Sequence, residues 1–354
     1  MVTSRADDPD FRTRVDHSLV AFVDDQRPVL AELGPEVEDL ADVSVAFVGG
    51  GKRLRPQFCY AGWLIAGGDP QDRGIVTAAA ALEWLQASAL VHDDLMDGSD
   101  TRRGRPSVHR DFESRHRRES RHGDAVGFGA STAVLLGDLL LSWCDEMFTA
   151  AVLGSESMRP HVMAARHFLD RCKTEVVAGQ FLDVTGQTRA SLSVDQAMTV
   201  VRYKSAKYTV ERPLHIGASL AGADADLIAA LSQVALPLGE AFQLRDDVLG
   251  VFGDPALTGK PAGDDLREGK RTVLVARAAE LTDDAGRALL GTSLGTSDGV
   301  MAVRELIVDS GALAAVEDDI ARLEDQADSA IDRLGPQARV VLGPLALTTT
   351  RRNR

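Results

Sequence analysis

The chain has 354 residues, a formal net charge of −14 and 44% hydrophobic residues, with only 5% aromatic residues. This length allows one large domain or two ordinary ones, and the apolar content is sufficient for a sizeable core. The negative charge argues against nucleic-acid binding, and no apolar run reads as long enough to span a bilayer, so no stable membrane anchor is expected.

Three cysteines, Cys59, Cys144 and Cys172, are isolated in the sequence and lack metal-type spacing. They are interpreted as buried, reduced thiols of a cytoplasmic protein. Residues 1–10 are polar and acidic, so they are not a signal peptide and are expected to form a disordered tail. A single domain is predicted to span residues 11–354, and the dominance of Ala, Leu and Val favours helix over sheet.

The first predicted helix begins at Phe11, where apolar residues start to recur with a helical period, and ends at Gly34-Pro35. A second amphipathic segment leads to the sequence GGGKRLRP at residues 49–56. Three consecutive glycines disfavour a helix, so a mobile turn is expected there. The proline that follows suits the first turn of the next helix, which is predicted to end near Ala66.

A long helix is predicted from about Ile75 to Asp97, and the highly charged segment Arg110–His122 follows it. That segment is interpreted as a solvated loop or short helix near the site, with a substrate lid as the alternative. The strongly apolar segment Ala130–Phe148 predicts a helix at the centre of a bundle or in a dimer interface.

The rest of the chain continues the helical pattern, apart from a Gly-, Pro- and charge-rich loop expected over Gly253–Thr272. Further helices are predicted at about 159–184, 193–222, 224–250 and 313–334. The sequence shows no run of alternating strands and no fixed-period repeat. It therefore predicts a single-domain, all-α helical bundle, an architecture that places metal sites on carboxylates projecting inward from facing helices.

Asp93, Asp94 and Asp97 lie near the C-terminal end of the long helix. In a helix Asp93 and Asp97 share one face, with Asp94 at its edge, and a cation would relieve their mutual repulsion. Oxygen-only ligation suits Mg2+, which binds through one or two carboxylates together with substrate phosphates. The alternative is a solvated acidic face, which is the commoner role of an acidic run.

A basic segment follows directly, with Arg102, Arg103 and Arg105 placed by Gly104 and Pro106. Guanidinium groups bind phosphate oxygens through paired, charge-assisted hydrogen bonds. Carboxylates for a metal, followed by arginines for phosphate, predict a diphosphate site in this part of the chain.

A second acidic helix offers a partner for the first cluster. Gln243, Asp246, Asp247 and Gly250 have the spacing of one helical face. Aspartates on two facing helices would clamp one metal-loaded diphosphate from opposite sides. Basic residues again lie nearby in the sequence, at Lys204, Lys260, Arg267, Lys270 and Arg271.

The order of these motifs resembles that of the trans-isoprenyl diphosphate synthases, the polyprenyl synthetase family. The resemblance covers about residues 15–340, and within the family the chain looks most like the actinobacterial-type geranylgeranyl diphosphate synthases. The matching motifs are GGGKRLRP at 49–56, HDDLMD at 92–97, TRRGRP at 101–106, GQFLD at 179–183, KSAKY at 204–208, FQLRDD at 242–247 and GKPAGDDLREGK at 259–270. Together and in this order they are highly specific.

The resemblance implies a homodimer of all-α subunits, each with a central cavity between the two aspartate-rich helices. The implied reaction joins isopentenyl diphosphate head to tail to an allylic diphosphate and releases diphosphate, with Mg2+ as the cofactor. Geranylgeranyl diphosphate is the expected product, and longer or shorter prenyl diphosphates are the alternatives.

The resemblance also assigns site residues. Those implied for Mg2+ are Asp93, Asp94, Asp97, Asp246 and Asp247. Those implied for the allylic diphosphate are Arg102, Lys204, Ser205, Gln243 and Lys260, and those for isopentenyl diphosphate are Lys52, Arg55, Gln86 and Arg103. Lys270 is placed among the substrate-binding residues, and the expected catalytic set is Asp93, Asp94, Asp97, Arg102, Lys204, Gln243 and Asp246.

The chemistry agrees with this assignment. Breaking the allylic C–O bond gives a carbocation and a highly charged leaving group, which Mg2+ and Arg or Lys donors stabilise. The proton lost afterwards is expected to go to the departing diphosphate, so no protein base is needed. His92, next to the aspartates, is therefore interpreted as a structural residue.

Two positions depart from the family pattern. Gly250 stands where a third aspartate is common, so the second site is expected to bind metal more loosely, with Asp254 or water as the substitute ligand. Gln86 stands where a histidine is common, and its amide can reach a phosphate but brings no charge.

The growing chain is expected to run along the long helix towards its N-terminus. Ser88 and Ala89, five and four residues before Asp93, are small and leave room for it. Trp84, about 13 Å from Asp93 along a helix, is the predicted floor, with a contribution from Leu85. The alternative is that Trp84 packs in the core or in a dimer interface, which would allow a longer product.

Three other functions are considered. A class I terpene cyclase carries a different second metal motif and does not need Lys52, Arg55 and Arg103 for a second diphosphate. A non-catalytic regulatory subunit of a heteromeric synthase is expected to lack the first aspartates, which are present here. An acidic helical interaction protein leaves the paired acidic and basic motifs unexplained.

Overall fold

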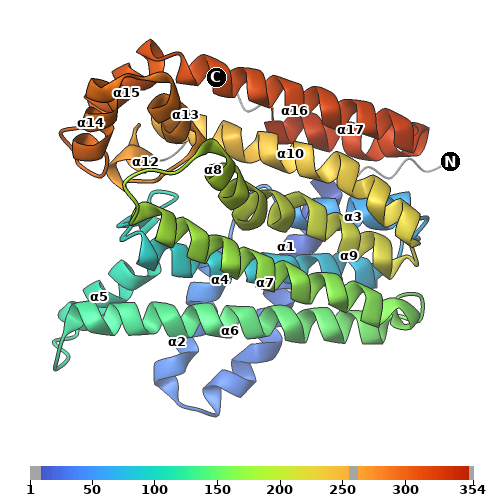
Figure 1. Ribbon diagram of the computed structural model, residues 1–354. Helices are drawn as coiled ribbons and strands as arrows, with labels where there is room; N and C mark the ends of the chain where they lie inside the picture. Colours follow the sequence, from blue (N-terminus) through green and yellow to red (C-terminus); the bar gives the residue numbers. More distant parts are fainter. Residues whose placement is uncertain (1–8, 255–261, 351–354) are drawn as a thin grey trace.

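The computed structural model describes residues 9–254 and 262–350, and within these ranges the chain is almost entirely helical (Figure 1). The elements of the first half are α1 (Pro9–Ala31), α2 (Pro35–Val48), α3 (Leu54–Ile65), α4 (Arg73–Met96), the strands β1 (Thr101–Arg102) and β2 (Arg105–Pro106), α5 (Val108–Arg118), α6 (Ala125–Gly154), the 3₁₀ turn η1 (Arg159–His161) and α7 (Val162–Gln187). Those of the second half are α8 (Val194–Val200), the π-helix η2 (Val201–Glu211), α9 (Arg212–Leu220), α10 (Ala225–Phe252), α12 (Asp264–Arg267), α13 (Val273–Leu281), α14 (Asp284–Ser293), α15 (Val300–Asp309), α16 (Ala312–Leu334) and α17 (Pro336–Thr350). The predicted all-α fold is confirmed.

Two helices, α4 and α10, organise the bundle. α4 packs against α6, α3 and α1, and α10 packs against η2, α16 and α17. Figure 1 shows α6 and α7 running alongside each other on one side of the molecule, with α16 and α17 on the opposite side. Because α4 and α10 carry the two acidic motifs, both motifs lie on helices that the other helices enclose.

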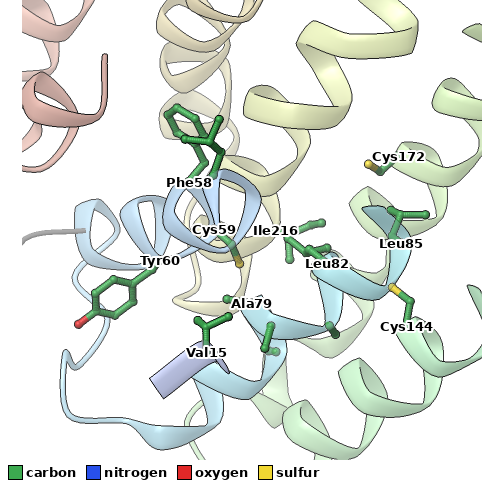
Figure 2. Close-up of a cluster of buried hydrophobic side chains, with 14 of the residues drawn as sticks. Val15, Phe58, Cys59, Tyr60, Ala79, Leu82, Leu85, Cys144, Cys172 and Ile216 are labelled. Atoms are coloured by element: carbon green, nitrogen blue, oxygen red, sulfur yellow. The ribbon is translucent and has the colours of Figure 1, made fainter. Parts of the chain in front are cut away.

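The main apolar core surrounds the middle of α4. Leu82 and Leu85 are buried in the same cluster as Cys144, Cys172 and Ile216 (Figure 2). A second, smaller cluster joins the C-terminal part of α10 to α13, α15 and α16. All three cysteines are free and buried, as the sequence predicted.

The crossing of α3 and α9 depends on two glycines. A Cβ atom added to Gly62 would lie 2.1 Å from the carbonyl oxygen of Leu214, and one added to Gly217 would lie 1.7 Å from that of Cys59. A larger residue at either position would force the two helices apart. This close crossing fixes α3, whose first turn carries the predicted phosphate ligand Arg55.

Side-chain caps fix where the two acidic helices begin. Asp72 accepts a hydrogen bond from the backbone N–H of Gly74 at 2.7 Å at the start of α4, and Asp224 accepts one from Leu227 at 2.9 Å at the start of α10. Each such cap stabilises a helix by about 1 kcal/mol. α4 ends at Met96, with Asp97 as its C-cap, close to the predicted bounds of the long helix.

Several predicted boundaries are corrected. α1 begins at Pro9, inside the predicted tail, and residues 1–8 lie outside the described residues. The charged segment 110–122 lies largely in α5, which confirms the short helix that was one of the two predicted forms, and Phe112 and His116 pack against Phe128 of α6. The predicted loop after Gly253 contains the short helix α12, and residues 255–261 are not described.

The prediction that no apolar run is long enough to span a bilayer is also corrected. α4, α6 and α10 are each long and apolar enough by length and composition. The apolar stretch of α4 is 72% buried inside the protein and that of α10 is 50% buried, so core packing accounts for their composition. The stretch of α6 is only 28% buried, which leaves an apolar face uncovered on a single chain.

Candidate active site

Asp93 lies in a hydrogen-bonded cluster that joins α4, α7 and η2. Its Oδ1 atom accepts hydrogen bonds from Gln180 Nε2 at 2.9 Å and from Lys204 Nζ at 3.2 Å, and Lys204 also donates to Asp183 Oδ2 at 2.6 Å. α7 and η2 approach closely at Gly179, where an added Cβ atom would lie 2.4 Å from the backbone nitrogen of Lys204. Sequence reasoning gave Gln180 and Asp183 no role, although their three-residue spacing places both on one helical face.

Asp94 has a different partner from its neighbour. Its carboxylate accepts hydrogen bonds from Arg102 Nε at 2.6 Å and from Arg102 NH2, and the residue is 1% exposed. The β1–β2 hairpin brings Arg102 there, and its turn has Arg103 and Gly104 at φ 51° and 72°, the left-handed pair typical of a two-residue hairpin. Asp94 therefore holds Arg102 through both oxygens, and its predicted role as a metal ligand stays a prediction.

Lys270 connects the first aspartate cluster to the segment that follows α10. Its Nζ atom lies 3.1 Å from Asp97 Oδ2, 2.7 Å from Glu268 Oε2 and 3.6 Å from Asp265 Oδ1. Glu268 also accepts a hydrogen bond from Ser99 Oγ at 3.1 Å. These contacts place the end of α4 beside residues 262–270, so the first aspartate cluster and the acidic segment after α10 meet through Lys270.

Asp247 is the buried member of the second acidic motif. Gln243, one turn earlier on α10, donates a hydrogen bond from Nε2 to Asp247 Oδ1 at 2.7 Å. Burial and the neighbouring charge of Asp265 raise the pKa of Asp247 well above its ordinary value. A carboxyl group in these surroundings favours a nearby cation, because a positive charge would stabilise its ionised form.

Asp265 occupies the space of the aspartate that the family pattern has at position 250. A Cβ atom added to Gly250 would lie 1.9 Å from Asp265 Oδ2. Asp254, the substitute that the sequence pointed to, is an exposed residue just after α10. Sequence reasoning missed Asp265, and the small residue at position 250 was the only local sign that another side chain fills this space.

The other residues predicted for the allylic side are distributed as follows. Asp246 is half-buried on α10 and Ser205 is buried on η2. Lys260 lies outside the described residues, so its role stays a prediction. Since η2 is a π-helix, its residues turn through a smaller angle than in an α-helix, which the sequence pattern around Lys204 did not reveal.

The lysines neutralise the first acidic cluster. Burial raises the pKa of Asp93, but Lys204 and Lys270 outweigh it and hold that pKa below its ordinary value. The pKa of Asp97 is raised, because burial and the charge of Asp93 outweigh Lys270. Burial lowers the pKa of each lysine, yet the carboxylates around them, led by Asp93 for Lys204 and Asp265 for Lys270, raise it above its ordinary value.

A second group of polar side chains centres on Arg55. Its guanidinium carbon lies 4.0 Å from the ring centre of Tyr208, and its NH2 donates to Thr209 Oγ1 at 2.8 Å. Tyr208 Oη donates to Gln86 Oε1, which leaves the amide nitrogen of Gln86 as the available donor. Burial raises the pKa of Tyr208, so its hydroxyl stays protonated at neutral pH. Within the described ranges, Arg55 Nε is buried and has no hydrogen-bond partner, as expected of a donor awaiting an anion.

The glycine-rich loop between α2 and α3, residues 49–52, meets the β1–β2 hairpin beside this group. Arg103 NH1 donates a hydrogen bond to the carbonyl oxygen of Gly49 at 3.2 Å. Lys52 and Arg103 are both exposed, one at the end of the loop and one at the tip of the hairpin. The structure thus brings together the residues that were predicted to hold isopentenyl diphosphate.

The acidic group fits a hard divalent cation by the chemistry of its donors. No three His, Cys, Asp or Glu side chains are assembled as a metal site in residues 9–254 and 262–350, and lysines pair with Asp93 and Asp97. All the donors are carboxylate oxygens, which suit Mg2+ rather than a softer metal. The metal roles of Asp93, Asp97, Asp246 and Asp247 stay predictions.

Trp84 lies in an aromatic cluster between α4, α6 and α1. Its ring is fully buried, stands edge-to-face with Trp143 at 5.5 Å and lies 6.0 Å from Phe22, and its Nε1 donates to Met147 Sδ at 3.2 Å. Nine residues are two and a half helical turns, so Trp84 lies on the opposite side of α4 from Asp93. This placement matches the alternative in which Trp84 is a core residue.

The face of α4 below Asp93 carries other residues. Ala89 is half-buried, Ser88 and Leu85 are buried, and Leu82, three turns before Asp93, is 1% exposed. His92 instead lies against α6, with Nε2 at 3.3 Å from the carbonyl oxygen of Val134, in agreement with its interpretation as a structural residue.

Comparison with known proteins decides the family. The sequence profile described as polyprenyl synthetase matches residues 37–308, which is most of the chain. The chain belongs to the polyprenyl synthetase family. The findings support a prenyl diphosphate synthase, a prenyltransferase of isoprenoid biosynthesis.

Individual relatives support the same class and differ in product. The crystal structure of geranylgeranyl pyrophosphate synthase from Corynebacterium glutamicum, complexed with isoprenyl diphosphate and magnesium, is 40% identical, has a TM-score of 0.91 and covers 97% of this chain and 99% of that chain. Geranylfarnesyl diphosphate synthase of Aeropyrum pernix is 33% identical over 76% of this chain and 79% of its own. The (2E,6E)-farnesyl diphosphate synthase of Mycobacterium bovis is 32% identical over 80% of this chain and 74% of its own.

Proposed function

We propose that this polyprenyl synthetase is a Mg2+-dependent, head-to-tail prenyltransferase that condenses isopentenyl diphosphate with allylic diphosphates and makes mainly geranylgeranyl diphosphate. The observation that carries the proposal is the division of the charged side chains into two adjoining groups. One group pairs carboxylates with Arg102 and Lys204, and the other gathers Arg55, Gln86 and Arg103. Two such groups serve two diphosphates, of which only one needs a metal.

The residues of the chain bind and orient both substrates. Arg102 and Lys204 donate hydrogen bonds to the allylic diphosphate, where negative charge grows as the C–O bond breaks. When bound, Mg2+ supplies Lewis-acid stabilisation of this leaving diphosphate. Arg55, Gln86 and Arg103 hold isopentenyl diphosphate so that its double bond lies beside the allylic carbon. That double bond forms the new C–C bond, and the proton lost from the isopentenyl unit leaves with the released diphosphate.

The proposed active unit is a homodimer. α6 and α7 expose large apolar side chains, including Leu135 at 68%, Val177 at 65% and Phe181 at 70% exposure. A soluble enzyme gains by covering such a face, and a second copy offers a matching apolar surface. Light scattering on the purified protein should give the mass of a dimer, and Leu135→Glu combined with Phe181→Glu should give a monomer. A wild-type monomer that binds lipid vesicles through α6 would contradict the dimer.

We assign the floor of the product channel to Leu85 and Leu82 in place of Trp84. Counting back from Asp93, Ala89 and Ser88 are small, and Leu85 and Leu82 are the next large residues that a chain running along this face would meet. Leu82→Ala should lengthen the main product, whereas Trp84→Phe should leave its length unchanged. The opposite pattern would restore Trp84 as the floor.

Product analysis tests the proposal as a whole. The purified protein is incubated with Mg2+, isopentenyl diphosphate and, separately, dimethylallyl, geranyl or farnesyl diphosphate, and the products are sized. A dominant twenty-carbon product supports the proposal, and another length keeps the enzyme class but changes the product. No condensation by a folded dimer with any starter would contradict the synthase and favour a regulatory subunit.

A further inference from the structure

Arg53 combines an unfavourable backbone conformation with a fully engaged side chain. It precedes α3 directly and has φ 54°, in the left-handed region that residues other than glycine rarely adopt. Its side chain is only 3% exposed. Such a conformation persists only where surrounding contacts determine it, so the contacts of the guanidinium group deserve an explanation.

The guanidinium group of Arg53 joins three helices. Its Nε donates to Asp16 Oδ1 of α1 at 2.7 Å, its NH1 donates to Glu83 Oε2 of α4 at 2.8 Å, and its NH2 donates to the carbonyl oxygen of Val48 at the end of α2 at 2.6 Å. The Glu83 side chain is 9% exposed, so this pair is buried. Three nitrogen atoms of one residue therefore hold one chain segment against α1, α2 and α4.

The segment around Arg53 carries two of the residues that are predicted to bind isopentenyl diphosphate. Lys52 immediately precedes Arg53, and Arg55 follows it in the first turn of α3. The preceding Gly50 and Gly51 have φ 73° and 99° and bring no side chains that could hold the loop. Gln57 Nε2 donates to the carbonyl oxygens of Lys52 and Arg53, which ties the loop to α3 but not to the rest of the bundle.

We propose that Arg53 is a positioning residue. It fixes the position of Lys52 and Arg55, which are predicted to bind isopentenyl diphosphate, relative to α4. Glu83 lies one turn before Gln86 and on the same helix as Asp93, so the Arg53–Glu83 pair fixes the separation of the two diphosphates. This inference rests on the proposed function. It goes beyond it by assigning a role to a residue that contacts neither substrate and by predicting which substrate is affected.

A test must separate positioning from stability. Arg53→Met alone leaves the buried carboxylate of Glu83 unpaired, which destabilises the fold whatever the role of Arg53. In Arg53→Met with Glu83→Met, apolar side chains of similar length replace both charges, which is often tolerated in a core. The double variant therefore keeps a folded protein while removing the link between the glycine loop and α4.

The experiment measures melting temperature, calorimetric binding of isopentenyl diphosphate without an allylic partner, and the KM of each substrate in the full-length dimer. The double variant should melt within a few degrees of the wild type. Its KM and dissociation constant for isopentenyl diphosphate should rise by on the order of 10- to 100-fold, while the KM for the allylic diphosphate and kcat at saturation stay within about twofold. Arg53→Lys keeps the charge but cannot reach three acceptors, and should give an intermediate increase.

A matched pair elsewhere in the fold provides the control. Arg212 and Glu175 form another buried pair between two helices, at 2.7 Å and 2.8 Å. Replacing both by Met should likewise leave the melting temperature within a few degrees of the wild type, and it should not change the KM for isopentenyl diphosphate. If the Arg53–Glu83 double variant keeps the wild-type KM, or if the control raises it equally, positioning by Arg53 is wrong. If the wild type itself neither binds nor consumes isopentenyl diphosphate, the proposed function fails, and the inference fails with it.

Discussion

The acidic half of the site contains Asp93, Asp97, Lys204 and Lys270, and the basic half contains Arg55, Gln86 and Arg103. The two halves satisfy their charges in opposite ways. In the acidic half, functional side chains bind one another, as in Asp93 with Lys204 and Asp97 with Lys270. In the basic half, Arg55 is held by the scaffold, against the ring of Tyr208 and the hydroxyl of Thr209, and keeps a buried donor without a partner among the described residues. The acidic half must therefore exchange ion pairs when its ligands arrive, whereas the basic half is already arranged for an anion.

The lysines of the acidic half allow several carboxylates to lie close together. Like charges at short range raise each other's pKa or force the chain apart, and lysines remove that penalty. Under the proposed function, Lys204 and Lys270 would bind the diphosphate and the carboxylates would hold Mg2+. The basic half needs no such exchange of ion pairs, because the negative charge of a phosphate can pair directly with the guanidinium group of Arg55.

The largest expected effect comes from breaking the acidic half at Asp93. Asp93→Asn removes a predicted metal ligand and the partner of Lys204, and kcat should fall by about 1,000-fold, equivalent to about 4 kcal/mol of lost stabilisation. Steady-state kinetics with Mg2+ measures it. Asp284→Asn, at a fully exposed position on α14, serves as the control and should keep wild-type activity. A loss of less than tenfold at Asp93 would contradict its catalytic role.

Ligand-induced stabilisation sharpens the comparison of the two halves. Mg2+ alone should shift the melting temperature little, because lysines already neutralise the carboxylates. Mg2+ with inorganic diphosphate at about 100 times the dissociation constant should raise it by about 3–4 °C. Scanning calorimetry on the purified protein measures both shifts. Equal stabilisation by Mg2+ alone would show that the acidic half is a preformed metal site.

A pH titration separates the site from its scaffold. His215 is 2% exposed, accepts a hydrogen bond from Arg212 NH1 at its Nδ1 atom and contacts Ser232 Oγ through Nε2. Burial lowers the pKa of His215 from 6.5 to about 4. The unfolded chain therefore takes up this proton first as the pH falls below 6.5, and the folded state loses about 2 kcal/mol between pH 7.5 and 5.

Denaturant unfolding at several pH values checks this contribution. His215→Gln, whose amide offers an acceptor and a donor without titrating, should flatten the pH dependence by that amount. His122→Gln, at an exposed position, should leave the curve unchanged. An equally steep curve for His215→Gln would assign the acid sensitivity to the carboxylate–lysine pairs of the site instead.

The smallest expected effect comes from removing one hydroxyl group that supports the basic half. Tyr208→Phe keeps the ring under Arg55 but removes the hydroxyl that holds the Gln86 amide, so the KM for isopentenyl diphosphate should rise about tenfold. The KM for the allylic diphosphate should not change. Tyr203→Phe is the matched control, because it removes a hydroxyl from the same helix. A rise in both KM values would show that the two halves are not independent.

The sequence alone determined the helical fold and the residue types of both halves. The three- and four-residue spacing of apolar side chains predicts helices whatever their partners, and Asp93 and Asp97 share a face because helix geometry is local. The approximate bounds of α4 followed for the same reason, whereas the buried, unpaired state of the cysteines followed from their isolated positions in the sequence. Lys52, Arg55 and Arg103 were grouped from their motifs alone, and the structure places the hairpin of Arg103 against the glycine loop that ends at Lys52 and precedes Arg55, while their shared role stays a prediction.

Only the tertiary structure decided which charges meet. Asp94 binds Arg102, Asp97 meets Lys270, and Asp265 fills the space beside Gly250, because each pairing depends on how distant segments pack. The same holds for Trp84, which the sequence placed on the product side and the structure places among aromatic residues of α1 and α6. Periodicity gives the face of a helix on which a side chain lies, and the packing of the bundle determines what that face meets.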